Sequence, residues 1–312
     1  MRIITVAMDT RRSSPVPICA CIGYFDGMHR GHQELIRRTI AMAKKNSCES
    51  AMITFDPDPW VTIRDMEDVK HITTMRQRMN MAVEMGIGNI VILKFSKQMS
   101  VLEPEEFVAR ILGKLNLKGI VCGFDFHYGH MGRGDCYSLS LQAEYPVEVV
   151  DAVTDEKGKI SSTRISECIE QARFEEASAM LGRTYEIEGT VIHGRHRGSS
   201  LGFPTANIKY AAEYLLPRPG VYAAYVVVDK KKYRAMVNLG HNPTMNYQDR
   251  LSLEAHLIGF TGNLYGKHMV LQFIQFMRPE KKFRNTTNLI LQLEQDLRDI
   301  RRLFDRYEKR VS

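Results

Sequence analysis

Two histidines stand close together in a glycine-rich segment near the start of the chain. His29 and His32 are three residues apart and follow the run 23–28. Residues three apart share one face of a helix, so both imidazoles can point to the same place. Glycines let a backbone approach phosphates, a helix N-terminus favours anions, and imidazoles there can stabilise charge on a transferring phosphorus. The segment predicts a nucleotide site; the alternative is a glycine-capped turn with two partly buried histidines.

A second polar group follows another glycine-rich stretch in the C-terminal half. Thr205 and Asn207 are two residues apart, after a loop that contains Gly194, Gly198 and Gly202. Side chains two apart on an extended segment point to the same side, and a hydroxyl and an amide oxygen are suitable ligands for Mg²⁺. Backbone N–H groups of such a loop can cradle phosphates. Without further context, a long hairpin loop is an equally good interpretation.

The elements that must position the first group alternate between strand and helix. Strand-like runs occupy 18–22, 50–55, 90–95, 119–122 and 147–150, and helical runs occupy 33–46, 75–85, 104–115 and 163–181. This alternation predicts a parallel sheet covered on both faces, a Rossmann-like α/β domain. The first glycine turn then lies between a strand and a helix, where an open α/β sheet presents its ligand crevice.

The pattern changes after residue 182. Strand-like runs at 185–193, 220–228, 233–238, 252–257 and 269–276 follow one another without intervening helices, and an amphipathic helix is expected at about 287–310. Such a series of strands predicts an antiparallel barrel or sandwich. We therefore expect two domains, residues 1–182 and residues 183–312.

The composition fits a two-domain globular protein of 312 residues with a net charge of +7. No apolar run approaches the roughly 20 residues of a membrane helix, and no signal peptide is recognisable, so we expect a cytoplasmic protein without a membrane partner. The basic excess suits anionic small molecules, and the arginine-rich C-terminus reads as the solvated face of a helix rather than a nucleic-acid site. The six cysteines fit neither a zinc site nor a disulfide framework, so we expect reduced thiols.

The first glycine turn resembles a nucleotidylyltransferase signature. Residues 23–32 read G-Y-F-D-G-M-H-R-G-H, similar to the G-x-F-D-G-x-H-x-G-H of the adenylyltransferase module of FAD synthetases. Segments 54–59, 123–129 and 161–166 resemble later motifs of that module in the same order. The resemblance implies catalytic roles for His29 and His32. It also implies ATP contacts at Gly23, Phe25, Asp26, Gly27, Asp125, Ser162 and Thr163.

Three positions depart from that family pattern. Asp58 stands where the family usually has histidine, His127 where arginine is common, and Ser166 where the family has a phosphate-binding arginine. Each lost charge-assisted contact costs about 1.5–3 kcal/mol. Arg164 is two residues from Ser166 and does not share its helix face. We therefore expect FAD formation to be weak beside FMN formation.

The second polar group resembles closely the G-x-P-T-A-N signature of riboflavin kinases, at residues 202–207. Segments 238–244, 253–257, 264–266 and 278–283 match further kinase motifs. The resemblance implies a β-barrel kinase in which Glu254 takes the proton of the ribityl 5′-hydroxyl, while Thr205 and Asn207 hold Mg²⁺. An apolar flavin slot is expected near the last strand and helix. ATP contacts are implied at Gly194, Arg197, Gly198, Gly202 and Pro204.

Together these motifs identify the chain as a member of the bifunctional riboflavin kinase/FAD synthetase family of bacteria. The expected substrates are riboflavin, FMN and ATP, with Mg²⁺ as cofactor, and the sequence indicates no protein partner. The expected reactions are phosphorylation of riboflavin to FMN and adenylylation of FMN to FAD. One alternative is a riboflavin kinase with a degenerate adenylyltransferase domain. Another is a flavin- or nucleotide-binding regulator that does no chemistry, against which Glu254, Thr205 and Asn207 count.

Overall fold

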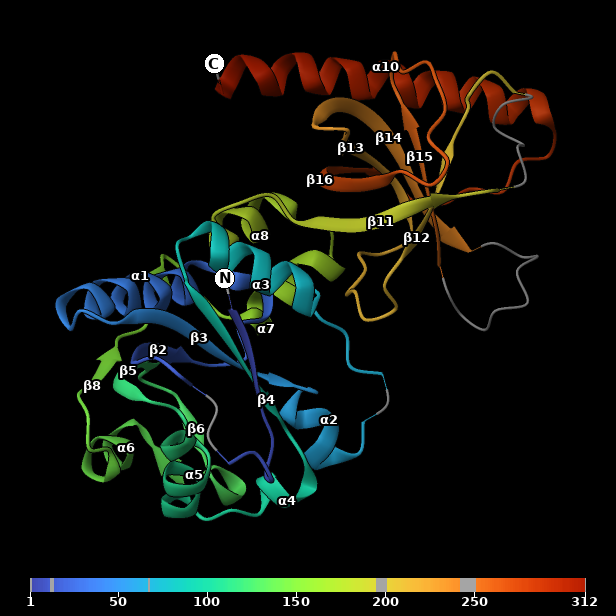
Figure 1. Ribbon diagram of the computed structural model, residues 1–312. Coiled ribbons are helices and arrows are strands. Elements are labelled where there is room, and N and C mark those ends of the chain that lie inside the picture. The colour runs from blue at the N-terminus through green and yellow to red at the C-terminus, as the bar shows by residue number, and fades with distance from the viewer. Residues whose placement is uncertain (1, 12–13, 67, 195–200, 242–250, 312) are drawn as a thin grey trace. The chain divides into compact units, whose positions relative to one another are not determined.

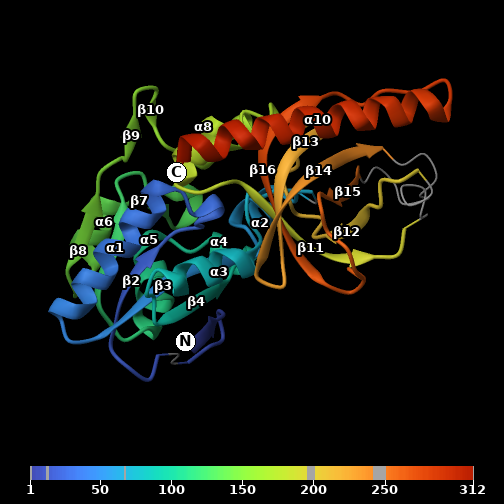
Figure 2. The same cartoon turned by 90° about the horizontal axis from the view of Figure 1, so that it is seen from above.

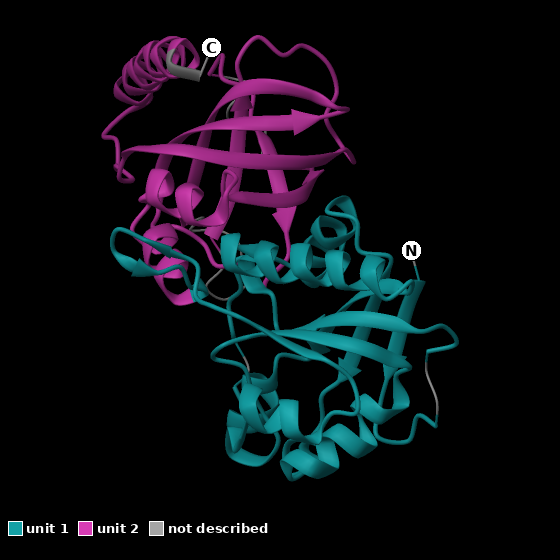
Figure 3. Ribbon diagram, turned by 90° about the vertical axis from the view of Figure 1, so that its left-hand side faces the viewer, with its two compact units in different colours: residues 1–162 teal, residues 163–312 magenta. Residues whose placement is uncertain are grey.

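The chain divides into two compact units, Met1–Ser162 and Thr163–Ser312 (Figure 3). The computed structural model describes residues 2–11, 14–66, 68–194, 201–241 and 251–311. Within these residues, no helix has the length and the apolar character needed to cross a membrane.

Six parallel strands form one sheet in the first unit, in the order β1-β4-β3-β2-β5-β8 (Figure 1). The strands are β1 (Arg2–Val6), β2 (Ile18–Ile22), β3 (Glu49–Asp56), β4 (Asn89–Lys94), β5 (Leu117–Gly123) and β8 (Val147–Val150). Every residue of β2 is buried, which explains its continuous apolar sequence. The predicted parallel α/β sheet is confirmed. The edge strand β1 was not predicted, because its residues are partly exposed and give no clear pattern.

Helices cover both faces of this sheet (Figure 1). The helices are α1 (Arg30–Lys45), α2 (Pro59–Arg64), α3 (Met75–Glu84), α4 (Lys97–Ser100), α5 (Pro104–Arg110) and α6 (Cys136–Gln142). One apolar core includes Ile36 of α1 and Ile90 of β4, and a second includes Leu93 of β4 and Phe107 of α5. Short elements complete the unit: 3-10 turns η1 (Asp26–Met28), η2 (Leu112–Lys114) and η3 (His130–Gly132), and strand pairs β6 (His127–Tyr128) with β7 (Gly134–Asp135) and β9 (Thr154–Asp155) with β10 (Gly158–Lys159).

The strand order reverses direction next to β2. The chain passes from β2 to β3 and then β4 on one side, and β5 then pairs with the other side of β2. In open α/β sheets, ligands bind outside the carboxyl ends of the strands at such a switch point. The turn after Ile22 and the loop after Gly123 both start there.

A closed antiparallel barrel forms the second unit, in the order β11-β12-β15-β14-β13-β16. Its strands are β11 (Glu186–Ile192), β12 (Ala206–Tyr210), β13 (Gly220–Val228), β14 (Lys231–His241), β15 (Leu251–Leu257) and β16 (His268–Arg278). Two helices precede it, α7 (Ser162–Glu170) and α8 (Phe174–Leu181). The single helix expected at 163–181 is wrong, because Ala172 takes a left-handed φ of 57° and separates the two.

The C-terminal helix α10 (Thr286–Val311) lies along the outside of the barrel (Figure 2). Its Ile300 and Phe304 pack against Val221 and Tyr225 of β13 and Met236 of β14. These contacts bury the apolar stripe that the sequence placed on this helix.

Candidate active sites

The segment from Gly23 to His29 forms an irregular turn between β2 and α1, called the histidine turn below. Phe25 and Met28 have left-handed φ values of 61° and 44°, and both side chains are buried. Gly27 has φ 74°, and a Cβ there would lie 3.0 Å from Ile72 Cδ1. Glycine is therefore required at this position by both conformation and space.

Asp26 fastens the histidine turn to the segment before α3. Its carboxylate accepts hydrogen bonds from the backbone N–H groups of Ile72 and Thr73, both at 3.0 Å, and from the Thr73 hydroxyl at 3.0 Å. The same hydroxyl accepts the N–H of Gly27 at 2.9 Å. In the structure the Asp26 side chain thus shapes the turn, and its contact with ATP stays a prediction.

His29 and His32 lie together at the start of α1, as their spacing predicted. His29 caps the helix, because its Nδ1 accepts the backbone N–H of His32 at 3.4 Å. The two rings are stacked, with centroids 3.7 Å apart. His32 Nδ1 is buried and has no hydrogen-bond partner among the described residues.

The His32 imidazole is held in its neutral form. Burial lowers its pKa well below the ordinary value, and electrostatic interactions with His29, Arg78 and Lys159 lower the pKa further. In the ligand-free protein His32 therefore offers an N–H donor rather than a full positive charge. Negative phosphate groups beside it would raise its pKa again.

The other predicted ATP contacts are only partly brought to the histidine turn. The Ser162 hydroxyl donates to the Asp26 carbonyl oxygen at 3.1 Å, so Ser162 adjoins the turn. Asp125 follows β5 at the switch point and forms an ion pair with Lys159. Thr163 is exposed at the start of α7 in the second unit, and its place beside the turn stays a prediction.

Asp58 occupies a cluster that contains another imidazole. Its carboxylate caps α2 by accepting the Trp60 N–H at 2.8 Å. His71 Nδ1 lies 3.9 Å from Asp58 Oδ2 and 3.9 Å from Asp26 Oδ2, while His71 Nε2 lies 3.2 Å from the Tyr24 hydroxyl. A histidine from a different segment therefore lies beside the position where the family usually has one.

The other two departures lie at the surface or in the second unit. His127 is exposed, and its Nδ1 lies 3.1 Å from the carbonyl oxygen of Gly132. Ser166 is half-buried on α7 and belongs to the second unit.

Three charged or ionisable residues near the histidine turn were not predicted: His71, Arg78 and Lys159. Arg78 could have been noticed in the sequence, because a charged residue at a buried position of a helical pattern is unusual. His71 and Lys159 belong to no regular pattern, and only the folded chain brings them near the turn.

The second site is a row of polar side chains on adjacent barrel strands. Thr205 Oγ1 donates to Glu254 Oε2 at 3.2 Å. Asn207 of β12 is paired directly with Glu254 of β15, and Asn238 of β14 is paired with Glu254 on its other side. The structure brings Thr205, Asn207 and Glu254 together, as the motifs implied. Asn238 was assigned no role from the sequence, although it begins a matched motif.

The glycine-rich loop before β12 is described only at its two ends. At Gly194 a Cβ would lie 2.1 Å from Asn207 Nδ2, so only glycine leaves room for that carboxamide. Gly202 has a left-handed φ of 82°, and the Pro204 carbonyl oxygen lies 2.9 Å from His256 Nδ1. The predicted ATP contacts Arg197 and Gly198 lie outside the described residues.

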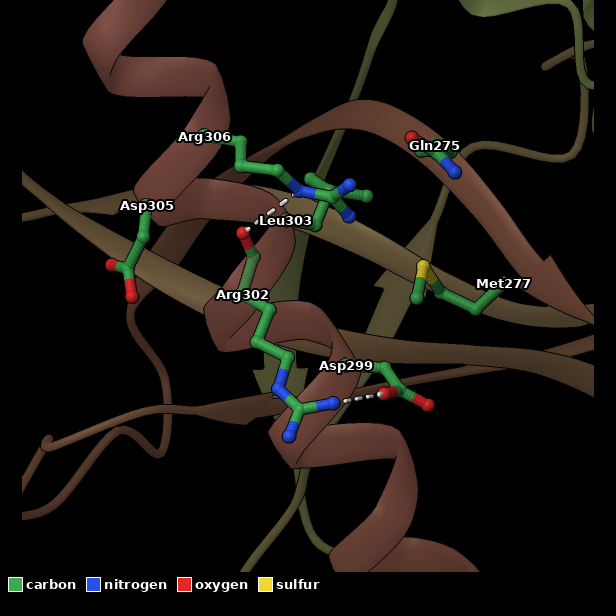
Figure 4. Close-up of a pocket in the computed structure, with 7 residues that line it drawn as sticks. All are labelled: Gln275, Met277, Asp299, Arg302, Leu303, Asp305 and Arg306. Carbon is green, nitrogen blue, oxygen red and sulfur yellow. Dashed lines mark hydrogen bonds and ion pairs between the residues drawn. The ribbon is translucent and has the colours of Figure 1, made fainter.

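A surface pocket of about 600 Å³ lies between β16 and α10 (Figure 4). It is lined by Gln275, Met277, Asp299, Arg302, Leu303, Asp305 and Arg306. Arg302 points toward Asp299, 3.9 Å away, and the Arg306 Nε donates to the Arg302 carbonyl oxygen at 3.4 Å. Charged side chains dominate this lining, whereas a flavin ring needs apolar walls. We therefore do not assign the flavin to this pocket.

Comparison with known proteins identifies both halves of the chain. The FAD synthetase family matches residues 12–164, and the riboflavin kinase family matches residues 181–304. A bifunctional riboflavin kinase/FMN adenylyltransferase of Listeria monocytogenes is 37% identical over 290 residues, covering 92% of each chain. This chain belongs to the bifunctional riboflavin kinase/FMN adenylyltransferase family. The bifunctional relative of Bacillus subtilis is 33% identical and covers 92% of this chain and 93% of its own.

A solved structure also matches this chain along almost its full length. It comes from Streptococcus pneumoniae and is named a macrolide-efflux protein. It is 31% identical, with a TM-score of 0.87, and covers 96% of this chain and 99% of its own. The two-domain fold is therefore shared along almost the full length of both chains.

These matches confirm the resemblance that the motifs indicated. The chain is an enzyme of flavin cofactor biosynthesis, with a riboflavin kinase half and an FMN adenylyltransferase half. Because relatives named as bifunctional match across both halves, a degenerate adenylyltransferase is not favoured, nor is a regulator without chemistry.

Proposed function

We propose that Glu254 is the base that accepts the 5′-hydroxyl proton of riboflavin as that oxygen attacks the γ-phosphorus of ATP. The bond between the γ-phosphorus and the bridging oxygen then breaks, releasing FMN and ADP. The observation that carries this proposal is the hydrogen bond of 3.2 Å between Thr205 Oγ1 and Glu254 Oε2, with Asn207 on the adjacent strand. It places a carboxylate beside two neutral oxygen donors, where a base and a phosphate can both be positioned.

The donors around Glu254 also fit Mg²⁺. Thr205 and Asn207 offer hard oxygen atoms, which this ion prefers. No cluster of three His, Cys, Asp or Glu side chains suited to a metal occurs in the described ranges. This is compatible with Mg²⁺, which commonly takes one or two protein ligands together with substrate phosphates. When bound, the ion would neutralise phosphate charge; Thr205 and Asn207 would hold it, while the barrel strands fix their positions.

In the first unit, we place adenylyl transfer at the histidine turn. A phosphate oxygen of FMN attacks the α-phosphorus of ATP, and pyrophosphate leaves as FAD forms. His29 and His32, stacked at the start of α1, would donate hydrogen bonds to the phosphate chain. Ser162 adjoins the same turn through the Asp26 carbonyl. The substrates of the two reactions are thus riboflavin, FMN and ATP.

We place the boundary between the two functional domains at residues 182–183 and the protein in the cytoplasm. The boundary is supported by family matches that end at residue 164 and begin at residue 181. The cytoplasm is supported by six cysteines that are all free thiols.

A product assay tests the kinase proposal. With riboflavin, ATP and Mg²⁺, the parent should form FMN, and Glu254→Gln should lose FMN formation by about a hundredfold or more, within the usual range for a general base. Glu213→Gln removes an exposed carboxylate from the same unit and is the matched control. Turnover by Glu254→Gln equal to that of Glu213→Gln would remove Glu254 from the mechanism.

A further inference from the structure

A buried arginine lies next to the histidine turn. Arg78 stands on α3 and is only 2% exposed. Burying a guanidinium is costly unless the charge is paired, so such a residue normally has a carboxylate in contact with it. The partners of Arg78 therefore indicate what its charge is for.

Among the described residues, the guanidinium of Arg78 donates hydrogen bonds to one residue of the turn, Tyr24. Its Nη1 donates to the Tyr24 carbonyl oxygen at 2.9 Å, and its Nη2 donates to the Tyr24 hydroxyl at 3.3 Å. The guanidinium carbon also lies 4.3 Å from the centre of the Tyr24 ring. These contacts fix the guanidinium against the backbone of the turn.

No carboxylate within the described ranges forms an ion pair with Arg78, and its Nε is buried without a partner. The two acidic residues of the neighbouring cluster, Asp26 and Asp58, accept hydrogen bonds from other groups. Asp26 accepts the N–H groups of Ile72 and Thr73, and Asp58 caps α2. The positive charge of Arg78 therefore lacks a direct counter-ion in the part of the chain that the structure describes.

The field of this charge reaches the proposed phosphate site. The positive charge of Arg78 is among the causes that lower the pKa of His32, together with burial and the neighbouring His29 and Lys159. A group that repels a proton on His32 attracts an anion placed beside it. A positive charge near His29 and His32 therefore favours the phosphates of ATP.

We infer that Arg78 supplies the fixed positive charge that holds the phosphate chain of ATP at the histidine turn. It acts through the turn as a positioning residue and does not touch the reacting atoms. The inference rests on the proposed adenylyl transfer and adds a residue to it. An arginine suits this task because it stays charged at all physiological pH values.

Two substitutions separate the charge from the hydrogen bonds. Arg78→Met removes the charge and the hydrogen bonds. Arg78→Lys keeps the charge but cannot make both hydrogen bonds to Tyr24 at once. Tyr24→Phe removes the contacts of the hydroxyl with Arg78 and His71 and leaves the charge of Arg78 in place. Arg76→Met, which removes an exposed charge from the same helix, is the matched control. FMN formation by the second unit of each variant serves as an internal measure of enzyme concentration.

The readouts are the KM for ATP in FAD formation from supplied FMN, pyrophosphate binding, and the pKa of His32 from NMR titration. We expect Arg78→Met to raise the KM for ATP and weaken pyrophosphate binding by roughly tenfold, the scale of a nearby charge that acts without a direct contact. It should also raise the pKa of His32. Arg78→Lys and Tyr24→Phe should stay within a few fold of the parent and leave that pKa low.

Two results would overturn the inference. One is an unchanged KM for ATP in Arg78→Met. The other is equal impairment of Arg78→Met and Arg78→Lys with an unshifted His32 pKa, which would mean that Arg78 only braces Tyr24. A parent that forms no FAD would contradict the proposed adenylyl transfer instead. Pyrophosphate binding and the His32 pKa would then still decide whether Arg78 attracts phosphate.

Discussion

The hydroxyl of Thr205 donates to the carboxylate of Glu254, and Asn207 is paired with Glu254 on the adjacent strand. If both groups hold Mg²⁺, we expect Thr205→Ala and Asn207→Ala to raise the Mg²⁺ concentration for half-maximal FMN formation by about tenfold, since each loses one polar contact. Riboflavin binding without metal should be unchanged. Thr190→Ala alters an exposed threonine of β11 and is the control. Superimposable Mg²⁺ titrations for all variants would contradict the metal role.

The lowered pKa of His32 has a consequence for stability. In the unfolded chain this imidazole titrates near 6.5, whereas in the folded chain its pKa is well below that value. Between the two values the unfolded chain binds more protons, so the free energy of unfolding rises with pH and falls on acidification. We expect this loss to approach about 1.4 kcal/mol per pH unit below pH 6.5.

Urea unfolding between pH 7 and pH 5 measures this effect. Trp60 is the single tryptophan of the chain and lies in the first unit, so its fluorescence reports on that unit. His32→Gln should show a smaller loss of stability on acidification than the parent. The exposed His127, replaced by glutamine, provides a comparison. Identical pH dependence in the parent and His32→Gln would show that the folded imidazole titrates normally.

At this scale the sequence predicted neighbours in the chain better than neighbours in space. The spacing of His29 and His32, and of Thr205 and Asn207, is local, so helix and strand geometry was enough to pair them. His71 and Arg78 contact Tyr24 of the turn from positions 47 and 54 residues further along the chain. No local period encodes such contacts, and they could not be predicted.

The elements were predictable where burial dictated their sequence. The central strands β2, β3 and β4 are mostly buried and read as apolar runs, and α10 carries one clear apolar stripe. The barrel strand β12 was missed, because its five residues follow a loop and include Asn207 and Lys209. The break between α7 and α8 rests on the backbone of Ala172, which its residue type does not signal.

A largely buried ion pair joins β16 to α10 in the barrel unit. Arg278 at the end of β16 donates to both carboxylate oxygens of Asp296 on α10, at 2.7–3.0 Å, and both side chains are largely buried. Asp296→Ala would leave a buried guanidinium without its partner. We expect a loss of about 3–5 kcal/mol in the free energy of unfolding.

Hydrogen exchange of β16 and α10 amides measures this loss. The control is Glu294→Ala, which removes an exposed ion pair with Arg298 on the same helix and should cost less than about 1 kcal/mol. Equal protection in the two variants would mean that the Arg278–Asp296 pair does not secure α10 to the barrel.

At the scale of the whole molecule, two folds with different chemistry share one chain. The parallel sheet presents the histidine turn at its switch point, and the barrel presents Glu254 between two polar neighbours. The histidine turn belongs to the first compact unit, and Glu254 with its polar neighbours belongs to the second. The two reactions should therefore be separable by substitution, although the product of one is the substrate of the other.

The most direct test supplies either riboflavin or FMN, with ATP and Mg²⁺, and separates FMN from FAD over time. The parent should convert riboflavin to FMN and then FAD. Glu254→Gln should form FMN from riboflavin about a hundredfold more slowly or worse, yet convert supplied FMN to FAD at the parental rate. His32→Ala should form FMN normally and lose FAD formation by tenfold or more, as expected for a lost phosphate donor. Loss of both products in each variant, or FAD formation untouched in His32→Ala, would contradict two separate sites with these residues at their centres.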